Sequence, residues 1–279
     1  MSIRKIKNIL MIFILSFASG LCLLPLFSII FFLIKNGIGY INIDFFMQNP
    51  KPFGEIGGGM LNSIVGTIVV VFWASIIGIP FALTNGIFLY EYRKTKIAYI
   101  VRLLTEVLQG LPSIVIGIIA YSWLVKRMGH FSSLSGSLAL AIMMVPIISR
   151  NTEEVLLLIP NTLKEASLAL GVTRVKTAFS VVLKTGINEI LGGILSAVAR
   201  VSGETAPLIF TAFGNRFFST NIMKPMSTLT LQIYDYARSP YKELHKQAWA
   251  GALTLVFLVL VLTLVSRLIV KNSSRYSKE

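Results

Sequence analysis

Long apolar segments alternate with short polar segments along the whole chain. A helix that crosses the ~30 Å hydrocarbon layer of a membrane takes about 20 residues. Six apolar segments suit such helices: residues 9–34, 61–89, 103–125, 134–148, 187–213 and 249–266, of which the fourth is short. Pro112 in the third segment and Pro207 in the fifth are expected to bend their helices. The pattern therefore predicts an all-α, polytopic membrane protein with six transmembrane helices.

The composition agrees with this class of protein. Of the 279 residues, 54% are hydrophobic and only 14% are charged, and the mean hydropathy is +0.76. These values lie outside the range of ordinary soluble domains. The single cysteine, Cys22, and the two histidines, His130 and His245, offer neither a disulfide framework nor a zinc cluster. Redox and metal chemistry are therefore not expected.

The positive charges indicate the orientation of the chain. The formal net charge is +14, and the chain has 26 lysines and arginines. Sixteen of these lie in the N-terminus, residues 93–102, residues 150–184 and the tail from residue 267, against nine in the other loops. Because cytoplasmic loops carry the excess of positive charge, both termini are expected on the cytoplasmic side. The charges are spread over several loops, which argues against a nucleic-acid-binding surface.

The inner loop between the fourth and fifth segments contains a predicted short helix, residues 163–170. Thr162 and Glu165 have the spacing of a capping box, and Gly171 suits the left-handed position after a helix end. So short a helix is marginal alone, and it must dock on another surface. Its apolar face can pack on the inner helix ends of this chain or fit a groove of a cytoplasmic partner, and the pattern leaves both open. That face comprises Leu163, Ala166 and Leu170.

Two opposite charges interrupt the fifth apolar segment at "ARVSGETAP", where Arg200 and Glu204 stand one helical turn apart. On a continuous helix both would lie deep in the membrane, on a face of small and polar residues. A lone charge at the bilayer centre costs about 2.5–3.5 kcal/mol on insertion scales. One interpretation is an ion pair that locks helix packing. The other is a functional path, which is favoured because an apolar pair would serve packing at least as well.

Four motifs carry a resemblance to a known family. "KEASLALGVTRVKTAFSVVL" is similar to the EAA loop of ABC importer permeases, with matches at Glu165, Ala166 and Gly171. Ser167 replaces the second alanine of that loop, and Leu183-Lys184 stands where many members have Leu-Pro. Three further motifs resemble the phosphate branch and occur in its order: "EVLQGLPSIVIGI", "SRNTEEVL" and "ARVSGETAPLIFTA". The chain thus resembles the PstA-type inner-membrane permeases of phosphate-specific ABC importers.

The resemblance implies a type I permease fold and a set of partners. Residues 1–60 would form an N-terminal transmembrane helix with an outer loop, and residues 61–279 the permease domain, with its EAA-type loop at about 150–186. The helix at about 163–171 would couple the chain to a cytoplasmic ATPase. A second related permease, two cytoplasmic ATP-binding subunits, an extracytoplasmic phosphate-binding protein and membrane lipid are the implied partners. The sequence has no G-x-x-x-x-G-K-[ST] motif, so the chain is expected to be non-catalytic, without a cofactor, and ATP is bound by a partner.

Under this resemblance, Arg200, Glu204 and Arg150 are the candidate residues of the substrate path. A guanidinium can replace phosphate hydration bidentately, and Glu204 would weaken the hold of Arg200 so that the ion is released. Arg150 would be a second cationic station near the cytoplasmic exit, although an arginine at an inner helix end is also what topology supplies. Alternatives are a permease for another small oxyanion and an ion-coupled secondary transporter. Visible internal repeats, which many secondary transporters have, are lacking.

Overall fold

The computed structural model describes residues 3–52, 55 and 57–276, and within these residues all of the regular structure is helical. Four helices are long and apolar enough to cross a membrane: α1 (Ile3–Gly37), α3 (Leu61–Glu91), α7 (Ser133–Leu158) and α14 (Lys242–Tyr276). Two bent pairs raise the number to six if each counts as one span. The expected all-α, polytopic membrane fold is thus confirmed.

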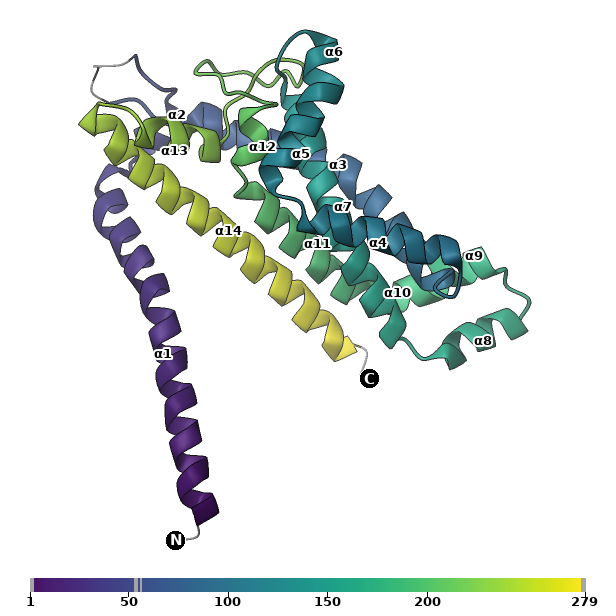
Figure 1. Cartoon of the computed structure of the whole chain (residues 1–279). Helices are drawn as coiled ribbons and strands as arrows, with labels where there is room; N and C mark the ends of the chain where they lie inside the picture. Colours follow the sequence, from purple (N-terminus) through teal and green to yellow (C-terminus); the bar gives the residue numbers. More distant parts are fainter. Residues whose placement is uncertain (1–2, 53–54, 56, 277–279) are drawn as a thin grey trace.

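Shorter elements connect and extend these helices. They are η1 (Ile38–Tyr40), α2 (Ile43–Met47), α4 (Lys96–Gly110), α5 (Ser113–Ala120), η2 (Tyr121–Val125), α6 (Lys126–Met128), α8 (Asn161–Ala169), α9 (Arg174–Thr177), η3 (Ala178–Val182), α10 (Leu183–Thr185), α11 (Ile187–Ser202), α12 (Ala206–Ile209) and α13 (Leu229–Ala237). In Figure 1, α2, α6, α12 and α13 lie at the upper end of the chain. The start of α1, the end of α14 and α8 lie toward the lower end.

The centre of the fold is the close contact of α3 with α7, which small residues make possible. A Cβ added at Gly78 would lie 3.2 Å from the Cα of Ala141, and one added at Gly86 would lie 2.8 Å from the carbonyl oxygen of Ser149. The Ser149 hydroxyl donates a 3.0 Å hydrogen bond to the carbonyl of Ala82. Close approach and hydroxyl bonds between helices are how helices associate in a membrane, where hydrophobic burial provides little drive.

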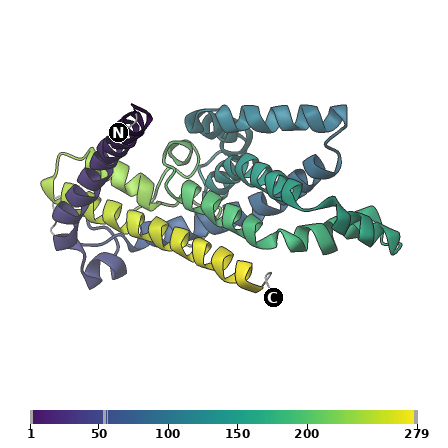
Figure 2. The ribbon, with the colours of Figure 1, turned by 90° about the horizontal axis from the view of Figure 1, so that it is seen from below.

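Helix α1 stands apart from this core. Only its last part approaches the rest of the chain, where Gly37 lies so close to α14 that an added Cβ would be 2.8 Å from the carbonyl oxygen of Trp249. Its apolar side chains are exposed, Phe13 and Phe27 by 67% and 63%. Figure 2 shows α1 at one end of the elongated chain and the α8–α10 segment at the other. The exposed apolar surface of α1 suits lipid or another apolar chain rather than water.

The third expected span is broken at Pro112, as predicted, and α4 and the α5–α6 segment meet there at 104°. Two other expected spans need correction. The fourth does not end at residue 148, because α7 continues to Leu158. The fifth is not one helix from 187 to 213: α11 ends at Ser202, and the chain continues into the short helix α12. The composition of a segment predicts burial in a membrane, but the local breakers decide where the helix stops.

Candidate functional site

Two helix breaks come together around a small cavity. The first is the α4–α5 bend, and the second is the turn between α11 and α12. A Cβ added at Gly117 of α5 would lie 2.6 Å from the Cα of Pro207 in α12, so the two breaks are in direct contact. The cavity beside them measures about 120 Å³ and is lined by Leu108, Gln109, Leu111, Ser113, Ile116, Met143, Pro146, Ile147, Arg200 and Glu204. We call it the Arg200 cavity.

Arg200 and Glu204 both line this cavity, but they are not an i, i+4 pair on one helix. Arg200 is in the last turn of α11, and its cation lies near the carbonyl end of the helix dipole. Glu204 follows the helix end at Gly203. Its backbone N–H donates to the carbonyl of Val201 at 3.1 Å. Across the residues that the structure describes, no ion pair joins the two side chains. The prediction of one continuous helix is therefore wrong. Arg200 and Glu204 nevertheless line the same cavity.

The charged lining is accompanied by polar residues from the other break. Gln109 is in the last turn of α4, and Ser113 begins α5. Sequence reasoning missed both residues as site candidates. The sequence nevertheless contains a sign of them, because they flank Gly110-Leu111-Pro112. A proline that stops a helix places the neighbouring polar side chains at a helix break instead of on a continuous apolar face. In the isolated chain Arg200 is exposed and Glu204 half-buried, so the cavity is open on one side.

A second, wider cavity lies near the first, on the side of α13. It measures about 190 Å³, and its lining includes Asn62, Arg216 and Asp235. Burial raises the pKa of the Asp235 carboxyl, while the nearby cations Arg216 and Arg238 act in the opposite direction. The two cavities share no lining residue. Helix α13 nevertheless contacts the turn after α11, because the Thr230 hydroxyl donates a 3.0 Å hydrogen bond to the carbonyl of Glu204.

Arg150 is placed differently from its prediction. It lies inside α7 rather than just past a helix end, and carboxylates from two helices surround it. Its guanidinium is 2.8 Å from Glu154, 3.6 Å from Glu153 and 3.7 Å from Glu106. Arg102 of α4 also pairs with Glu153, whose side chain is only 3% exposed. The cluster therefore ties α4 to α7 and neutralises Arg150 locally.

The predicted inner helix is present as α8, and it packs on its own chain along one edge. Its Ser167 hydroxyl lies 2.9 Å from that of Thr177, and Lys164 forms an ion pair of 2.7 Å with Glu91 at the end of α3. The opposite edge is exposed and includes Leu163, Glu165, Ala166 and Leu170. The chain itself thus packs on the edge that carries Lys164 and Ser167. The apolar face with Leu163, Ala166 and Leu170 remains exposed and can meet another protein.

The ends of α8 confirm one prediction and correct another. Gly171 has φ +80, the left-handed conformation expected after the helix end. The capping box is absent. The helix begins at Asn161 with Pro160 before it and without a side-chain cap, so Thr162 lies inside the first turn. Proline fixes φ at a value that suits the start of a helix. Here the helix therefore starts directly after Pro160, before Thr162, which was the predicted cap.

Comparisons with known proteins agree with this architecture. Residues 78–276 match the family model described as binding-protein-dependent transport system inner membrane component. The chain is 39% identical to the phosphate transport system permease protein PstA of Yersinia pestis, over 95% of this chain and 90% of that protein. It is 40% identical to the protein of the same name from Haemophilus influenzae, over 95% of this chain and 94% of that protein.

A solved structure has the same fold. A chain of the bacterial alginate ABC transporter, in complex with an alginate pentasaccharide-bound periplasmic protein, superposes with a TM-score of 0.66 at 13% identity, over 99% of this chain and 98% of that chain. At that identity the likeness concerns the fold alone. Together with the matched family model and the two relatives, it places the bent helices and α8 in an ABC transporter permease fold. The chain therefore belongs to the family of binding-protein-dependent transport system inner membrane components and, within it, to the PstA permeases.

Proposed function

We propose that the chain is a permease subunit of an ATP-driven phosphate importer and forms half of its translocation path. The names of its PstA relatives support phosphate as the substrate. The observation that carries the proposal within this chain is the shared lining of the Arg200 cavity by Arg200 and Glu204 at the meeting point of two helix breaks. Broken helices at such points supply polar groups where a continuous helix would present only apolar side chains.

Arg200 is the proposed phosphate-binding group of this path. Its planar guanidinium remains charged at every working pH and donates two parallel hydrogen bonds to an oxyanion. Gln109 and Ser113 line the same cavity and can donate further hydrogen bonds to phosphate oxygens. The open side of the cavity suits a path shared between two chains, since a second permease would close it. A small polar cavity of this kind matches a small ion.

Glu204 limits how tightly the path holds the ion. A transport path must bind its substrate well enough to admit it and weakly enough to release it. A carboxylate in the same cavity repels a phosphate anion and attracts the guanidinium. The turn after α11 gives Glu204 a position outside the helix, from which its side chain can approach or leave Arg200 with small changes of the backbone. In this proposal Glu204 pairs with Arg200 after the ion has left.

Arg150 serves the proposed path as a second cation on the route to the cytoplasm. Because Glu106, Glu153 and Glu154 surround it, it can hold phosphate only after the carboxylates have moved away. The cluster spans α4 and α7, so a relative movement of these two helices would release the guanidinium. Arg150 is thus proposed to bind phosphate in only one state of the transport cycle.

The exposed edge of α8 is the proposed contact with the ATPase. Leu163, which is 42% exposed, and Ala166 form an exposed apolar surface, and Glu165 lies beside them. An apolar face in a helix this short is stable only when packed. In the assembly we propose, a second related permease and two cytoplasmic ATP-binding subunits complete the importer. A phosphate-binding protein delivers the ion from outside, and ATP is hydrolysed by the partner rather than by this chain.

The orientation follows from this assignment. If α8 meets a cytoplasmic ATPase, the lower end of the chain in Figure 1 is cytoplasmic, together with the start of α1 and the end of α14. The distribution of lysine and arginine supports the same orientation. Residues 1–60 then form the first span and an outer loop that lead into the permease domain of residues 61–279, with the coupling segment around residues 150–186.

Uptake by the reconstituted assembly tests the proposal. Proteoliposomes that contain the chain with its permease and ATPase partners are expected to accumulate phosphate only with the binding protein outside and ATP inside, at the ATPase face. Orthovanadate enclosed with the ATP is expected to stop this uptake. Uptake that survives the inhibition of ATP hydrolysis would instead support an ion-coupled secondary transporter. Competition by sulfate or arsenate at equal concentration would extend the substrate to other small oxyanions.

A further inference from the structure

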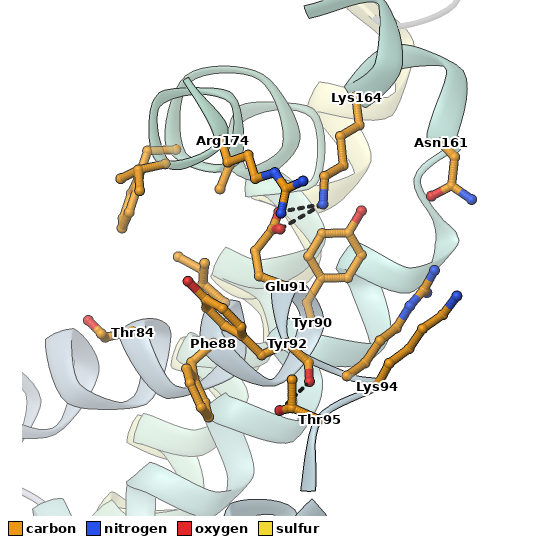
Figure 3. Close-up of a pocket in the computed structure, with 15 residues that line it drawn as sticks. Thr84, Phe88, Tyr90, Glu91, Tyr92, Lys94, Thr95, Asn161, Lys164 and Arg174 are labelled. Carbon is orange, nitrogen blue, oxygen red and sulfur yellow. Dashed lines mark hydrogen bonds and ion pairs between the residues drawn. The ribbon is translucent and has the colours of Figure 1, made fainter. Parts of the chain in front are cut away.

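The largest cavity we describe lies between the end of α3 and the coupling segment, and it is separate from the Arg200 cavity. It measures about 530 Å³ and is bounded by the last turn of α3, the turn that leads into α4, and residues of α8, α9 and η3 (Figure 3). We call it the basic pocket. It has no lining residue in common with the Arg200 cavity. Its role is therefore not explained by the proposed transport path.

The basic pocket has two chemically different parts. Its wall is apolar and aromatic, with Phe88, Val175 and Phe179 from two distant segments of the chain. Its rim carries four cationic side chains: Arg93, Lys94, Lys164 and Arg174. Val175 is 67% exposed and Phe179 48% exposed, so the apolar wall continues to the outer surface of the chain. Such a pocket suits a molecule with an anionic head and an apolar tail.

The positive charge of the rim is only partly compensated. Glu91 is the one carboxylate in the lining, and both of its oxygens accept hydrogen bonds from the Lys164 amine, at 2.8 and 2.7 Å. In Figure 3 the side chains of Lys164 and Arg174 both reach toward Glu91, whereas Lys94 lies on the other side of Tyr90. For Arg93, Lys94 and Arg174 the described residues provide no carboxylate within ion-pair distance. The rim thus has an excess of about three positive charges facing one cavity.

We propose that the basic pocket binds the phosphodiester headgroup of an anionic phospholipid, with an acyl chain along Val175 and Phe179. Arginine is well suited to a phosphodiester because its fork donates two hydrogen bonds to two oxygens, and Arg93 and Arg174 reach the cavity from opposite segments. In the orientation proposed above, on which this step rests, the pocket lies at the cytoplasmic ends of membrane helices, a recurrent place for such headgroups. The phospholipid bridges α3 and α9.

Size and wall chemistry favour a lipid over free inorganic phosphate, which shares the same headgroup chemistry. The cavity volume lies in the range of about 300–1,000 Å³ that is usual for organic ligands. A free tetrahedral anion would leave most of this space empty and would gain nothing from the aromatic wall. Because α8 is tied to the same pocket through Lys164 and Glu91, the bound lipid also stabilises the position of the coupling segment.

Native mass spectrometry of the complete transporter complex tests this site. The complex is exchanged into detergent and titrated with phosphatidylglycerol, with phosphatidylcholine of the same acyl chains, and with inorganic phosphate. The test variant is Arg93→Gln/Arg174→Gln. The matched control is Lys126→Gln/Arg127→Gln, which removes the same charge from exposed residues of α6, at the other end of the chain. We expect phosphatidylglycerol to be retained at least fivefold better than phosphatidylcholine, and the preference to be lost only in the test variant.

A second measurement does not depend on the folding of a variant. Photoactivatable phosphatidylglycerol in nanodiscs of the unmodified complex is expected to label peptides that contain residues 84–95 or 174–179. Equal retention of the two phospholipids, an unchanged preference in the test variant, or labelling confined to other peptides would overturn the proposal. Displacement of phosphatidylglycerol by millimolar inorganic phosphate would assign the pocket to the free anion instead and would also overturn it. None of these results depends on which ion the complex transports.

Discussion

Lys164 of α8 and Glu91 at the end of α3 form an ion pair of 2.7 Å although they are 73 residues apart in the chain. Both side chains are partly exposed, by 22% and 15% of their surfaces. Helix α3 in turn packs on α7 through Gly78 and Gly86. The pair therefore connects the coupling segment to the central helices, and it offers a direct route by which movement of α8 reaches them.

Breaking this pair is expected to weaken coupling more than folding. In Glu91→Gln the carboxylate charge that holds Lys164 is lost. Because such a partly exposed pair contributes up to about 1 kcal/mol, we expect up to about a fivefold fall in phosphate transported per ATP hydrolysed. The measurement is the ratio of uptake to ATPase rate in proteoliposomes. Glu243→Gln is the control, since it removes a carboxylate paired only locally with Lys246. An unchanged ratio in Glu91→Gln would contradict the proposed route.

Reversing the charge at Glu165 is expected to release the ATPase. Glu165 lies on the exposed edge of α8, so Glu165→Arg changes the proposed docking surface without removing a contact inside the chain. We expect the ATPase subunit to co-purify at reduced yield and phosphate uptake to be lost. Lys126→Glu, a charge reversal on an exposed residue of α6, is expected to leave both unchanged. Normal association and normal uptake in Glu165→Arg together would remove α8 from the docking surface.

The α3–α7 contact is expected to tolerate no added methyl group at its closest point. A Cβ at Gly86 would lie 2.6 Å from the Cβ of Thr152, whereas a Cβ at Gly20 of α1 meets nothing within 4 Å. Overpacking of this kind costs about 1–3 kcal/mol. We expect Gly86→Ala to lower the melting temperature of the purified complex and Gly20→Ala to leave it unchanged. If the two variants melt together, the helices are less tightly packed than described.

The membrane class and the family were predictable from the sequence because they depend on features that a linear pattern carries. Apolar segments of sufficient length predicted the long helices, and the segment with Glu165 and Gly171 predicted a short helix, which is present as α8. Gly171 was predictable because a positive φ favours glycine at a helix end. These are local properties, and tertiary contacts did not override them.

The geometry of the site was not predictable, because it depends on where helices break and what they meet. In "ARVSGETAP" a bend was expected at Pro207, but α11 already ends at Ser202, so Arg200 is in a helix and Glu204 in a turn. The polar companions Gln109 and Ser113 come from the α4–α5 break, which is distant in sequence. Similarly, the sequence places Arg150 just after an apolar segment, as expected for a cation at a helix end. Only the packing of α4 on α7 brings Glu106 close to it.

Glu204 is expected to control release of the ion rather than its binding. In Glu204→Gln the amide has nearly the same shape but no charge, so the repulsion of phosphate and the attraction of Arg200 are both lost. We expect the reconstituted complex to hold radiolabelled phosphate longer and to transport it several-fold more slowly. Glu55→Gln, an exposed residue between α2 and α3, is the control. Faster turnover in Glu204→Gln, or release at the unmodified rate, would contradict this role.

Phosphate uptake by Arg200→Lys is the most direct test of the central claim that the Arg200 cavity is part of the translocation path. Lysine keeps the positive charge but lacks the planar fork. We therefore expect the complex to assemble and its initial rate of ATP-dependent phosphate uptake to fall about tenfold or more, which corresponds to about 1.4 kcal/mol of free energy. Arg127→Lys, the same substitution in α6, is expected to transport normally. Uptake by Arg200→Lys at the rate of the unmodified complex would contradict the claim.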